Sequence, residues 1–286
     1  MMTSRSLWPL FVTLFVTLFV AASAARASAE EPTKTAERYV CPPCGSDCHD
    51  ETFDAPGSCS VCGMTLVRES TVRNVAIVVW NGAEVLDFTG PAEVYAASSS
   101  DAGAFRVYTV ASSAEPIVSQ GFLNVVPNYS IADCPAPDIV VLPGGGTGSA
   151  LEDAALMKWL ADVSKRAEYM TSVCTGAFLL ARIGLLDGKT ATTWHGAVDR
   201  LRELAPRTKV VADARVVDNG SVLTSAGVSA GIDGALYLVS RLHGEEAARR
   251  TARYMEYDWR PERLRFVRPA SVEGTERLQP PAESGE

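Results

Sequence analysis

The sequence predicts an α/β protein: a layered, mostly parallel β-sheet with flanking helices, preceded by a small cysteine-rich module. Three observations carry this prediction. From Asn74 to Tyr257, short apolar segments alternate with stretches of helical period, as in a parallel sheet. Val75–Trp80 is apolar without interruption, as expected of a strand buried on both faces. Before residue 74, five of the 7 cysteines crowd into one short segment.

The other elements are predicted in order along the chain. Further strands are expected at Phe105–Val110, Asp138–Leu142, Tyr169–Val173 and Lys189–Thr193. Helices are expected at Pro91–Ser98, Leu151–Lys165, Ala197–Leu204, Val228–Leu242 and Glu245–Tyr257. A β-hairpin is expected around Asp218-Asn219-Gly220, between strands at Ala214–Val217 and Ser221–Thr224.

The segment Glu168–Gly184 places a cysteine between a strand and a helix. An apolar strand leads to Cys174, and apolar residues then recur at helical spacing until Gly184. A thiol at a helix N-terminus faces unpaired N–H groups and the positive end of the helix dipole, and both favour the reactive thiolate. Cys174 is therefore a candidate nucleophile. The alternative is a buried structural cysteine, since free Cys behaves as a small hydrophobe.

Length and composition indicate a globular, acidic protein. The 286 residues suffice for one large domain and a small module. The chain is 47% hydrophobic and 21% charged, within the range of globular proteins. Its formal net charge is -8, so nucleic acid is not expected as a partner.

Residues 1–29 have the pattern of a secretory signal peptide. Arg5 is followed by the apolar run Leu7–Val20, and Ala27-Ser28-Ala29 fits the small-residue rule for cleavage after Ala29. An uncleaved anchor is the alternative, but the run is short for a membrane span of about 20 residues. We therefore expect an exported protein, with the periplasm as its destination.

Residues 39–67 predict a small zinc-ribbon-like module that binds about one metal ion. Two Cys-x-x-Cys pairs lie about fifteen residues apart, and each puts two thiolates on one tight turn, as tetrahedral zinc requires. So short a segment needs the metal to fold. Disulfide pairing in an oxidising compartment is the alternative. The expected ligands are Cys41, Cys44, Cys59 and Cys62, with Cys48, His49 and Met64 as alternates.

The module resembles the heavy-metal-binding domain of exported metal-handling proteins and copper-transporting ATPases. The likeness is strongest from Pro56-Gly57 through Cys59, Cys62, Gly63, Met64 and Leu66. The family usually has Cys-Pro-Met-His in the first half, where this chain has Cys41-Pro42-Pro43-Cys44. Because the first half departs from the family pattern, the site is expected to be more zinc-like and less copper-like, although the Met64 thioether would suit Cu(I).

Three candidate site segments follow strands of the main domain. They are Asp87, the glycine run Gly144–Gly146, and Cys174-Thr175. In sheets of this type, ligands bind beyond the carboxyl ends of the strands, so the three segments are expected to meet at one edge.

Residues 74–257 resemble the ThiJ/PfpI superfamily, which implies a flavodoxin-like, glutamine amidotransferase-like fold. The segments that carry the resemblance are Gly82–Pro91, Val141–Gly145, Ser172–Ala177, and Gly184–Gly188 with Ala191-Thr192-Thr193. Within the superfamily these residues are most similar to isonitrile hydratases and to the ligand-binding half of AraC-type regulators. No helix-turn-helix pattern follows Tyr257, and the composition of the tail, residues 258–286, favours partial disorder. A transcription factor is therefore not expected.

Chemistry and the resemblance assign the same roles. Cys174 is expected as nucleophile, with Asp87 beside the thiol and protonated, because two adjacent anions would repel. The alternative for Asp87 is a cap for the helix near Gly90. The N–H groups of Gly145 and Thr175 are expected to form an oxyanion hole, although the glycines would also suit a plain tight turn.

The two remaining histidines are assigned differently. His195 is a candidate general base, but relatives often place His directly after Thr-Thr, where this chain has Trp194. A shift of one residue in an extended segment turns a side chain to the opposite face, so Trp194 is the other candidate to line the pocket. His243, at a helix end, is expected to be a cap.

The expected function is enzymatic hydration of a small carbon electrophile, as in isonitrile hydratases. A glyoxalase-type enzyme and a non-enzymatic redox or metal-stress sensor are the alternatives. The expected partners are a small-molecule substrate and a metal ion, with no cofactor for the main domain. Members of the superfamily commonly dimerise, so the resemblance also allows a homodimer.

Overall fold

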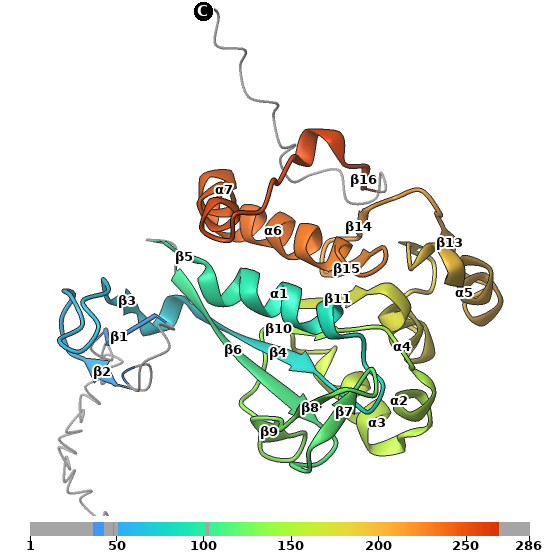
Figure 1. Cartoon of the computed structure of the whole chain (residues 1–286), viewed down its shortest axis with the longest axis horizontal. Coiled ribbons are helices and arrows are strands. Elements are labelled where there is room, and N and C mark those ends of the chain that lie inside the picture. Colours follow the sequence, from blue (N-terminus) through green and yellow to red (C-terminus); the bar gives the residue numbers. More distant parts are fainter. Residues whose placement is uncertain (1–36, 43–47, 49–50, 101–102, 269–286) are drawn as a thin grey trace, which may run out of the picture. The chain divides into compact units, whose positions relative to one another are not determined.

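The computed structural model describes residues 37–42, 48, 51–100 and 103–268 (Figure 1). The predicted signal peptide, Cys44, His49 and residues 269–286 lie outside the described residues. Within the described part of the chain, no helix is both long enough and apolar enough to span a bilayer.

The cysteine-rich module is built on a small antiparallel sheet. Its central strand β1 (Tyr39–Val40) pairs with β2 (Thr52–Phe53) on one side and β3 (Val67–Arg68) on the other. Its buried apolar cluster consists of Leu66 and three cysteines: Cys41, Cys48 and Cys59. A core this small contributes little burial, so the thiols are central to its stability. The prediction of a small ribbon-like module is confirmed.

The main domain is organised on a nine-stranded sheet with the strand order β16-β14-β15-β11-β10-β4-β6-β5, and β9 beside β6. Its centre is parallel and consists of β4 (Val72–Val78), β6 (Gly103–Ala111), β10 (Ile139–Leu142), β11 (Tyr169–Val173) and β15 (Val222–Ser225). The predicted hairpin is present, because β14 (Val216–Asp218) pairs with β15 in antiparallel register. The α/β prediction is confirmed.

Helices cover both faces of this sheet (Figure 1). One face carries α1 (Val85–Ala97), α6 (Ala230–His243) and α7 (Glu245–Tyr254), which pack against one another. The other face carries α2 (Gly148–Glu152), α3 (Ala154–Val163), α4 (Ala177–Arg182) and α5 (Val198–Leu204). The short peripheral strands are β5 (Ser99–Ser100), β7 (Ile117–Ser119), β8 (Leu123–Val125), β9 (Tyr129–Ser130), β12 (Thr190–Ala191), β13 (Lys209–Val210) and β16 (Phe266–Val267).

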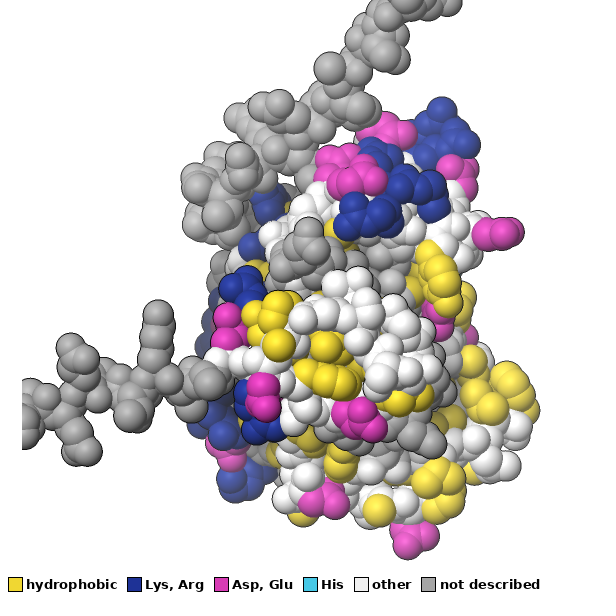
Figure 2. Space-filling model, turned by 90° about the vertical axis from the view of Figure 1, so that its left-hand side faces the viewer, with side chains coloured by type: hydrophobic (Ala, Val, Ile, Leu, Met, Phe, Trp, Pro, Cys, Tyr) yellow, Lys and Arg dark blue, Asp and Glu magenta, His cyan; other side chains and the backbone are white. Residues whose placement is uncertain are grey.

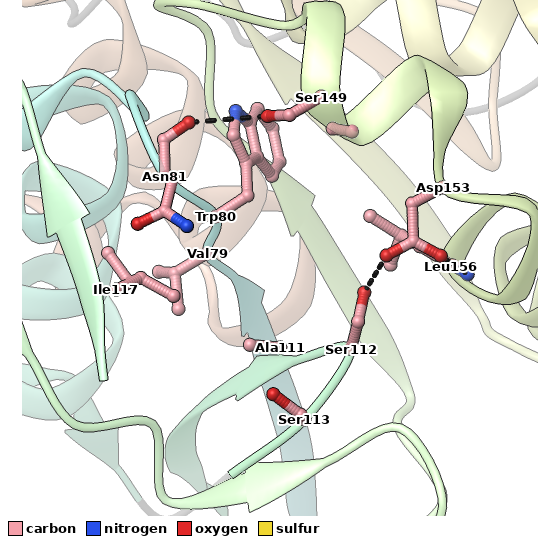
Figure 3. A pocket seen from close by; sticks show the side chains of 11 residues that line it. Val79, Trp80, Asn81, Ala111, Ser112, Ser113, Ile117, Ser149, Asp153 and Leu156 are labelled. Carbon is pink, nitrogen blue, oxygen red and sulfur yellow. Dashed lines mark hydrogen bonds between the residues drawn. The ribbon is translucent and has the colours of Figure 1, made fainter. Parts of the chain in front are cut away.

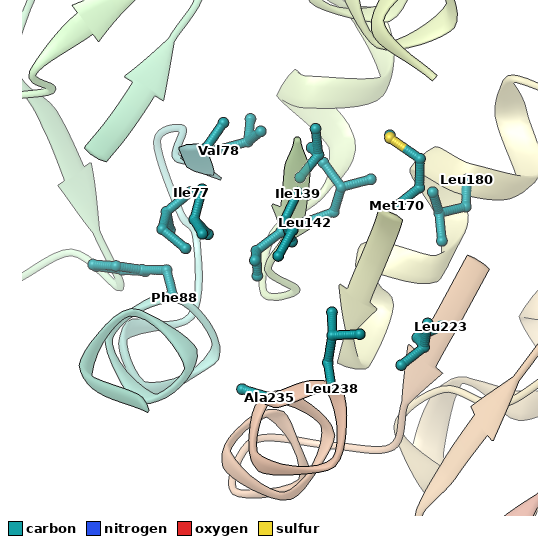
Figure 4. Close-up of a cluster of buried hydrophobic side chains, with 14 of the residues drawn as sticks. Ile77, Val78, Phe88, Ile139, Leu142, Met170, Leu180, Leu223, Ala235 and Leu238 are labelled. Carbon is teal, nitrogen blue, oxygen red and sulfur yellow. The ribbon is translucent and has the colours of Figure 1, made fainter. Parts of the chain in front are cut away.

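The core lies between the central strands and the helices on either side (Figure 4). Residues 75–78 of β4 and all of β10 are apolar and buried on both faces, as parallel strands between two helical layers must be. Leu238 and Ala235 of α6 approach the sheet from one side, and Leu180 of α4 approaches it from the other. This packing fixes the strand ends that carry the candidate site.

Two helices differ from the prediction. Helix α1 begins at Val85, before the predicted start at Pro91, so Gly90 and Pro91 lie inside the helix. A Cβ atom at Gly90 would lie 2.9 Å from Ile232 of α6, so the glycine serves close helix packing rather than a helix start. The predicted helix at 151–165 is two helices, because Asp153 caps α3 by accepting hydrogen bonds from Ala155 and Leu156.

The described part of the tail packs on the sheet. Strand β16 pairs with β14, the Phe266 ring stacks on Tyr237 at 4.9 Å, and Trp259 is buried. Nearby, α7 is polar in sequence and carries i,i+4 ion pairs such as Arg249–Glu245. Near the top of the view in Figure 2, basic and acidic side chains lie next to each other on the surface.

Candidate active site and metal centre

Cys174 lies at the carboxyl end of β11, where the chain turns sharply into a short 3-10 turn and then α4. Its φ is 55°, an unusual conformation for a non-glycine residue, which costs roughly 1–3 kcal/mol and persists only where the surroundings impose it. Two hydrogen bonds do so: the Cys174 N–H donates to the Ala226 carbonyl at 2.7 Å, and the Thr193 hydroxyl donates to the Cys174 carbonyl at 2.7 Å. The residue is 6% exposed.

Asp87 is fully buried in the first turn of α1 and belongs to the same site. Its Oδ2 atom accepts a hydrogen bond from the Gly144 N–H at 2.8 Å, while Oδ1 makes no hydrogen bond of ordinary geometry. The N-cap position of α1 is Glu84, and no N–H of α1 bonds to the Asp87 side chain. The alternative that Asp87 caps a helix near Gly90 is therefore wrong. The helix begins earlier, at Val85, and the Asp87 carboxylate accepts a hydrogen bond from the glycine loop instead.

Burial controls ionisation of this pair. Burial raises the pKa of Asp87 to about 7, against the opposing effect of the Gly144 N–H and the Cys174 thiol. Burial, and then the negative charge of Asp87, raises the pKa of Cys174 to about 11. The N–H groups of Thr175 and Gly145 lower the thiol pKa, as the sequence predicts, but they are outweighed. The turn itself therefore favours the thiolate, as expected, but the expectation of a lowered thiol pKa is wrong, because burial and the Asp87 charge have the larger effect.

Asp87 and Cys174 consequently act as one coupled acid. The first proton leaves the pair near neutral pH, mainly from Asp87 with its pKa of about 7, and the remaining proton stays mainly on sulfur, because the pKa of Cys174 is about 11. A thiolate beside a protonated carboxyl and a thiol beside a carboxylate are the two forms of the same charge state. The pair can therefore attack an electrophile through sulfur and supply a proton from the neighbouring oxygen.

The glycine loop after β10 approaches Cys174 closely. A Cβ atom at Gly144 would lie 2.7 Å from the Cys174 Cβ, so no side chain fits there. Gly145 adopts φ 97°, which side-chain-bearing residues rarely adopt, and its carbonyl accepts a hydrogen bond from the Thr175 hydroxyl at 3.1 Å. Because the N–H groups of Gly145 and Thr175 both stabilise negative charge at Cys174, the loop is more than a plain turn.

The structure does not bring His195 to the thiol. His195 is exposed in a 3-10 turn, with its ring 4.9 Å from that of Trp194. Among the described residues, the side chains that influence the Cys174 pKa are Asp87 and Thr175, and His195 is not one of them.

His243 is not a cap. Its two ring nitrogens are buried without hydrogen-bond partners, and its ring stacks on Phe105 at 4.7 Å. Burial, and then the positive charge of Arg73, lowers its pKa to about 4, so this half-buried ring is neutral at pH 7. The expectation of a capping role is wrong because the ring packs onto β6 instead of reaching the last carbonyls of α6.

A cavity that the sequence did not reveal lies between the ends of β4 and β6 and helices α2 and α3 (Figure 3). Its volume is about 150 Å³. Val79, Ile117 and Leu156 line its apolar part, and Ser112 donates a hydrogen bond to Asp153 at its rim. Cys174 and Asp87 do not line this cavity, so it is separate from the candidate active site.

Four cysteines of the module form a candidate metal centre. The sulfur atoms of Cys41, Cys48, Cys59 and Cys62 all lie within 4.8 Å of one another, and those of Cys41 and Cys62 are 3.3 Å apart. The N–H groups of Cys62 and Val61 lower the pKa of Cys59 to about 7, which favours the metal-binding thiolate. Such a compact set of sulfur donors fits a tetrahedral thiophilic ion.

The centre includes one ligand that the sequence ranked as an alternate. Cys48 is in the cluster, and Met64 packs against it. Cys44 and His49, the other predicted donors, lie outside the described residues. Spacing alone does not select Cys48, because the set of thiols that converge depends on how the module folds.

Comparisons with known proteins identify both parts of the chain. The family model described as "DJ-1/PfpI family" matches residues 73–241, and the one described as "Heavy metal binding domain" matches residues 38–69. An isonitrile hydratase from Pseudomonas putida is 34% identical over 184 residues, covering 64% of this chain and 78% of the relative. Protein DJ-1alpha of Drosophila melanogaster is 27% identical over 201 residues, covering 68% and 88%.

Solved structures agree with this assignment. A ThiJ/PfpI family protein from Pseudomonas syringae superposes with a TM-score of 0.59 at 33% identity, covering 66% of this chain and 76% of that one. Together, the sheet order, the cysteine turn and these matches establish that the chain belongs to the DJ-1/PfpI family and carries a heavy metal binding domain before it.

Proposed function

We propose that the main domain is an isonitrile hydratase-like enzyme that adds water to a small carbon electrophile, with Cys174 as nucleophile. The observation that carries this proposal is the constrained Cys174 turn, which sits beside a buried carboxyl and two N–H donors. The similarity to the Pseudomonas putida isonitrile hydratase supports the choice of substrate class.

The geometry supports a redox-neutral sequence that begins with attack by sulfur. Sulfur attacks the terminal carbon of R–N≡C while the thiol proton passes through Asp87 to that carbon, giving R–N=CH–S. Water then adds across this C=N bond, its oxygen to carbon and a proton to nitrogen. The carbon–sulfur bond breaks, the hydroxyl proton returns through Asp87, and R–NH–CHO leaves.

The two N–H groups would stabilise charge during this sequence. Gly145 and Thr175 already lower the pKa of the thiol, so they would stabilise the thiolate and the oxygen that bears charge as carbon–sulfur cleavage begins. Losing one such donor typically costs about 10²–10³-fold in kcat. No general base from His195 is required, because Asp87 supplies and accepts the protons.

Cys174→Ala should abolish turnover of isonitriles, because no other group at the site can form the covalent intermediate. The matched control is Cys134→Ala, which removes a half-buried thiol away from the site and should keep near wild-type rates. Activity is measured with isonitriles and, in parallel, with methylglyoxal. Unchanged turnover in Cys174→Ala would exclude the mechanism.

The same samples separate the other functions. Turnover of methylglyoxal alone would favour a glyoxalase-type enzyme. Formation of sulfenic acid at Cys174 at low peroxide, without turnover of either compound, would favour a redox sensor.

We further propose that the module holds one zinc ion through Cys41, Cys48, Cys59 and Cys62. Four convergent thiolates leave no open coordination position, which is typical of structural zinc. The metal would supply folding energy to a module whose own apolar core is small.

Cys48→Ser should weaken zinc binding and destabilise the module, whereas Cys134→Ser should leave both unchanged. Metal content is measured on purified protein by elemental analysis, and affinity by competition with a chelator. Purified wild-type protein that carries no metal, with its module thiols paired as disulfides, would contradict this proposal.

A further inference from the structure

We propose that Trp194 is a specificity-determining residue, which forms an apolar wall at the mouth of the Cys174 site and favours substrates with a bulky cyclic or aromatic substituent. This inference deepens the proposed hydratase function and rests on it. The substrate class is inferred from the protein surface that would contact the substituent of the substrate, away from the reacting carbon.

Two hydrogen bonds place Trp194 beside the nucleophile. The Thr193 hydroxyl donates to the Cys174 carbonyl, and the Cys174 N–H donates to the Ala226 carbonyl, both at 2.7 Å. Residues 193 and 226 therefore flank the Cys174 backbone. Trp194 and Gly227 are the next residues along these two segments.

The indole ring of Trp194 occupies space left by two glycines. A Cβ atom at Gly227 would lie 2.4 Å from Cδ1 of the indole, and one at Gly196 would lie 2.6 Å from Cζ3 and Cη2. Real Cβ atoms do not approach this closely, so any side chain at either position would displace the ring. The ring is thus seated against the backbone of the segment that holds Cys174 in place.

Exposure shows which part of the site the ring can serve. Trp194 is 39% exposed, whereas Cys174 is 6% exposed, so the ring offers apolar surface outside the buried reaction centre. Asp87, Gly145 and Thr175 act on the sulfur and the reacting carbon, and they provide no selection for the substituent. An aromatic wall does, since burial of apolar area strengthens binding with substituent size.

The test compares methyl, cyclohexyl and benzyl isonitrile as substrates of the full chain. In Trp194→Ala, kcat/KM for the two bulky substrates should fall about tenfold or more through KM, with methyl isonitrile little changed. Trp194→Phe should retain most of the preference. The matched control is Phe122→Ala, which removes another exposed ring, 71% exposed, from the β7–β8 hairpin.

A second measurement does not depend on turnover. Alkylation of Cys174 by N-benzylmaleimide and by N-ethylmaleimide is followed on the Cys174 peptide by mass spectrometry. The benzyl-to-ethyl rate ratio should fall in Trp194→Ala, and also in Gly227→Ala, which keeps the indole but displaces it. Circular dichroism confirms that each variant is folded.

The two readouts distinguish the failure of this inference from the failure of the proposed function. If wild type turns over no isonitrile, the hydratase proposal fails, and the alkylation ratios still decide whether Trp194 selects for apolar groups. If wild type is active but Trp194→Ala keeps the wild-type substrate and alkylation ratios, the role of Trp194 is overturned.

Discussion

Asp87 and Cys174 show how far the surroundings of a residue can override its local backbone. The N–H groups at the turn stabilise a thiolate, yet burial and the Asp87 charge raise the thiol pKa to about 11. Burial also raises the pKa of Asp87 to about 7, which is far above the usual pKa of a carboxyl. Near neutral pH the carboxyl therefore loses its proton while the thiol keeps its own.

Replacing Asp87 by Asn should lower the pKa of Cys174, because it removes the negative charge that raises it. Turnover should nevertheless fall at least a hundredfold, because the amide cannot shuttle a proton. The thiol pKa is measured from the pH dependence of Cys174 alkylation in both proteins. An unchanged or higher thiol pKa in Asp87→Asn would show that the carboxyl does not act on the sulfur.

The sequence predicts that three segments meet at one edge of the sheet, and the structure brings them together. Asp87, the Gly144–Gly146 loop and Cys174 meet because each follows a parallel strand, and strand ends share one edge. The direction of the thiol pKa depends on burial, which no local pattern reports. The positions of Trp194 and His195 depend on how residues 193–197 turn, which is set by hydrogen bonds to distant segments.

At the scale of elements, strands were easier to predict than helix boundaries. The strand Tyr169–Val173 and the hairpin of β14 and β15 agree with the apolar runs and the Asn-Gly turn. The start of α1 was missed because Gly90-Pro91 has the pattern of a helix start. Tertiary packing of Gly90 against α6 overrides that pattern.

The sequence does not predict strand β16. This strand anchors the tail by pairing with β14, and an ion pair between the following residue, Arg268, and Asp218 adds to it. Asp218 is buried at 1% exposure and accepts hydrogen bonds from Tyr237 at 2.6 Å, Arg241 at 3.0 Å and Arg268 at 2.8 Å. Arg268 belongs to the segment that follows β16. The two-residue strand is too short to be recognised from periodicity, so its partner strand decides its conformation.

Truncation after Tyr257 should therefore lower the melting temperature, by roughly 5 °C or more, since it exposes the surface under Trp259 and Phe266 and removes Arg268 from Asp218. The matched control is truncation after Arg268, which keeps these contacts. Thermal unfolding of the two truncated proteins is compared with that of the full chain. Equal melting temperatures would show that the tail does not stabilise the domain.

At the scale of the whole molecule, the chain joins a heavy metal binding domain to a DJ-1/PfpI domain. Both domains can be predicted from the sequence, because each carries local motifs. The metal-binding domain has two Cys-x-x-Cys pairs, and the DJ-1/PfpI domain has motifs that follow its strands. The exact ligand set was less predictable, since Cys48 reaches the cluster only through the fold of the module.

We propose that the protein is exported, as Arg5, the run Leu7–Val20 and the Ala27-Ser28-Ala29 site suggest. Expressed in a Gram-negative host, the mature chain should be recovered from the periplasm with Glu30 as its first residue. Cell fractionation and N-terminal mass spectrometry check this. A chain that stays in the cytoplasm with residues 1–29 attached would contradict it.

The central claim, covalent catalysis by Cys174, is tested most directly by intact-protein mass spectrometry during turnover of an isonitrile. The account predicts that quenched wild-type protein gains the mass of one substrate molecule, localised to the Cys174 peptide, and that Cys174→Ala shows neither the adduct nor formamide product. Formation of the formamide by Cys174→Ala at the wild-type rate, or turnover with the substrate bound to a different residue, would contradict it.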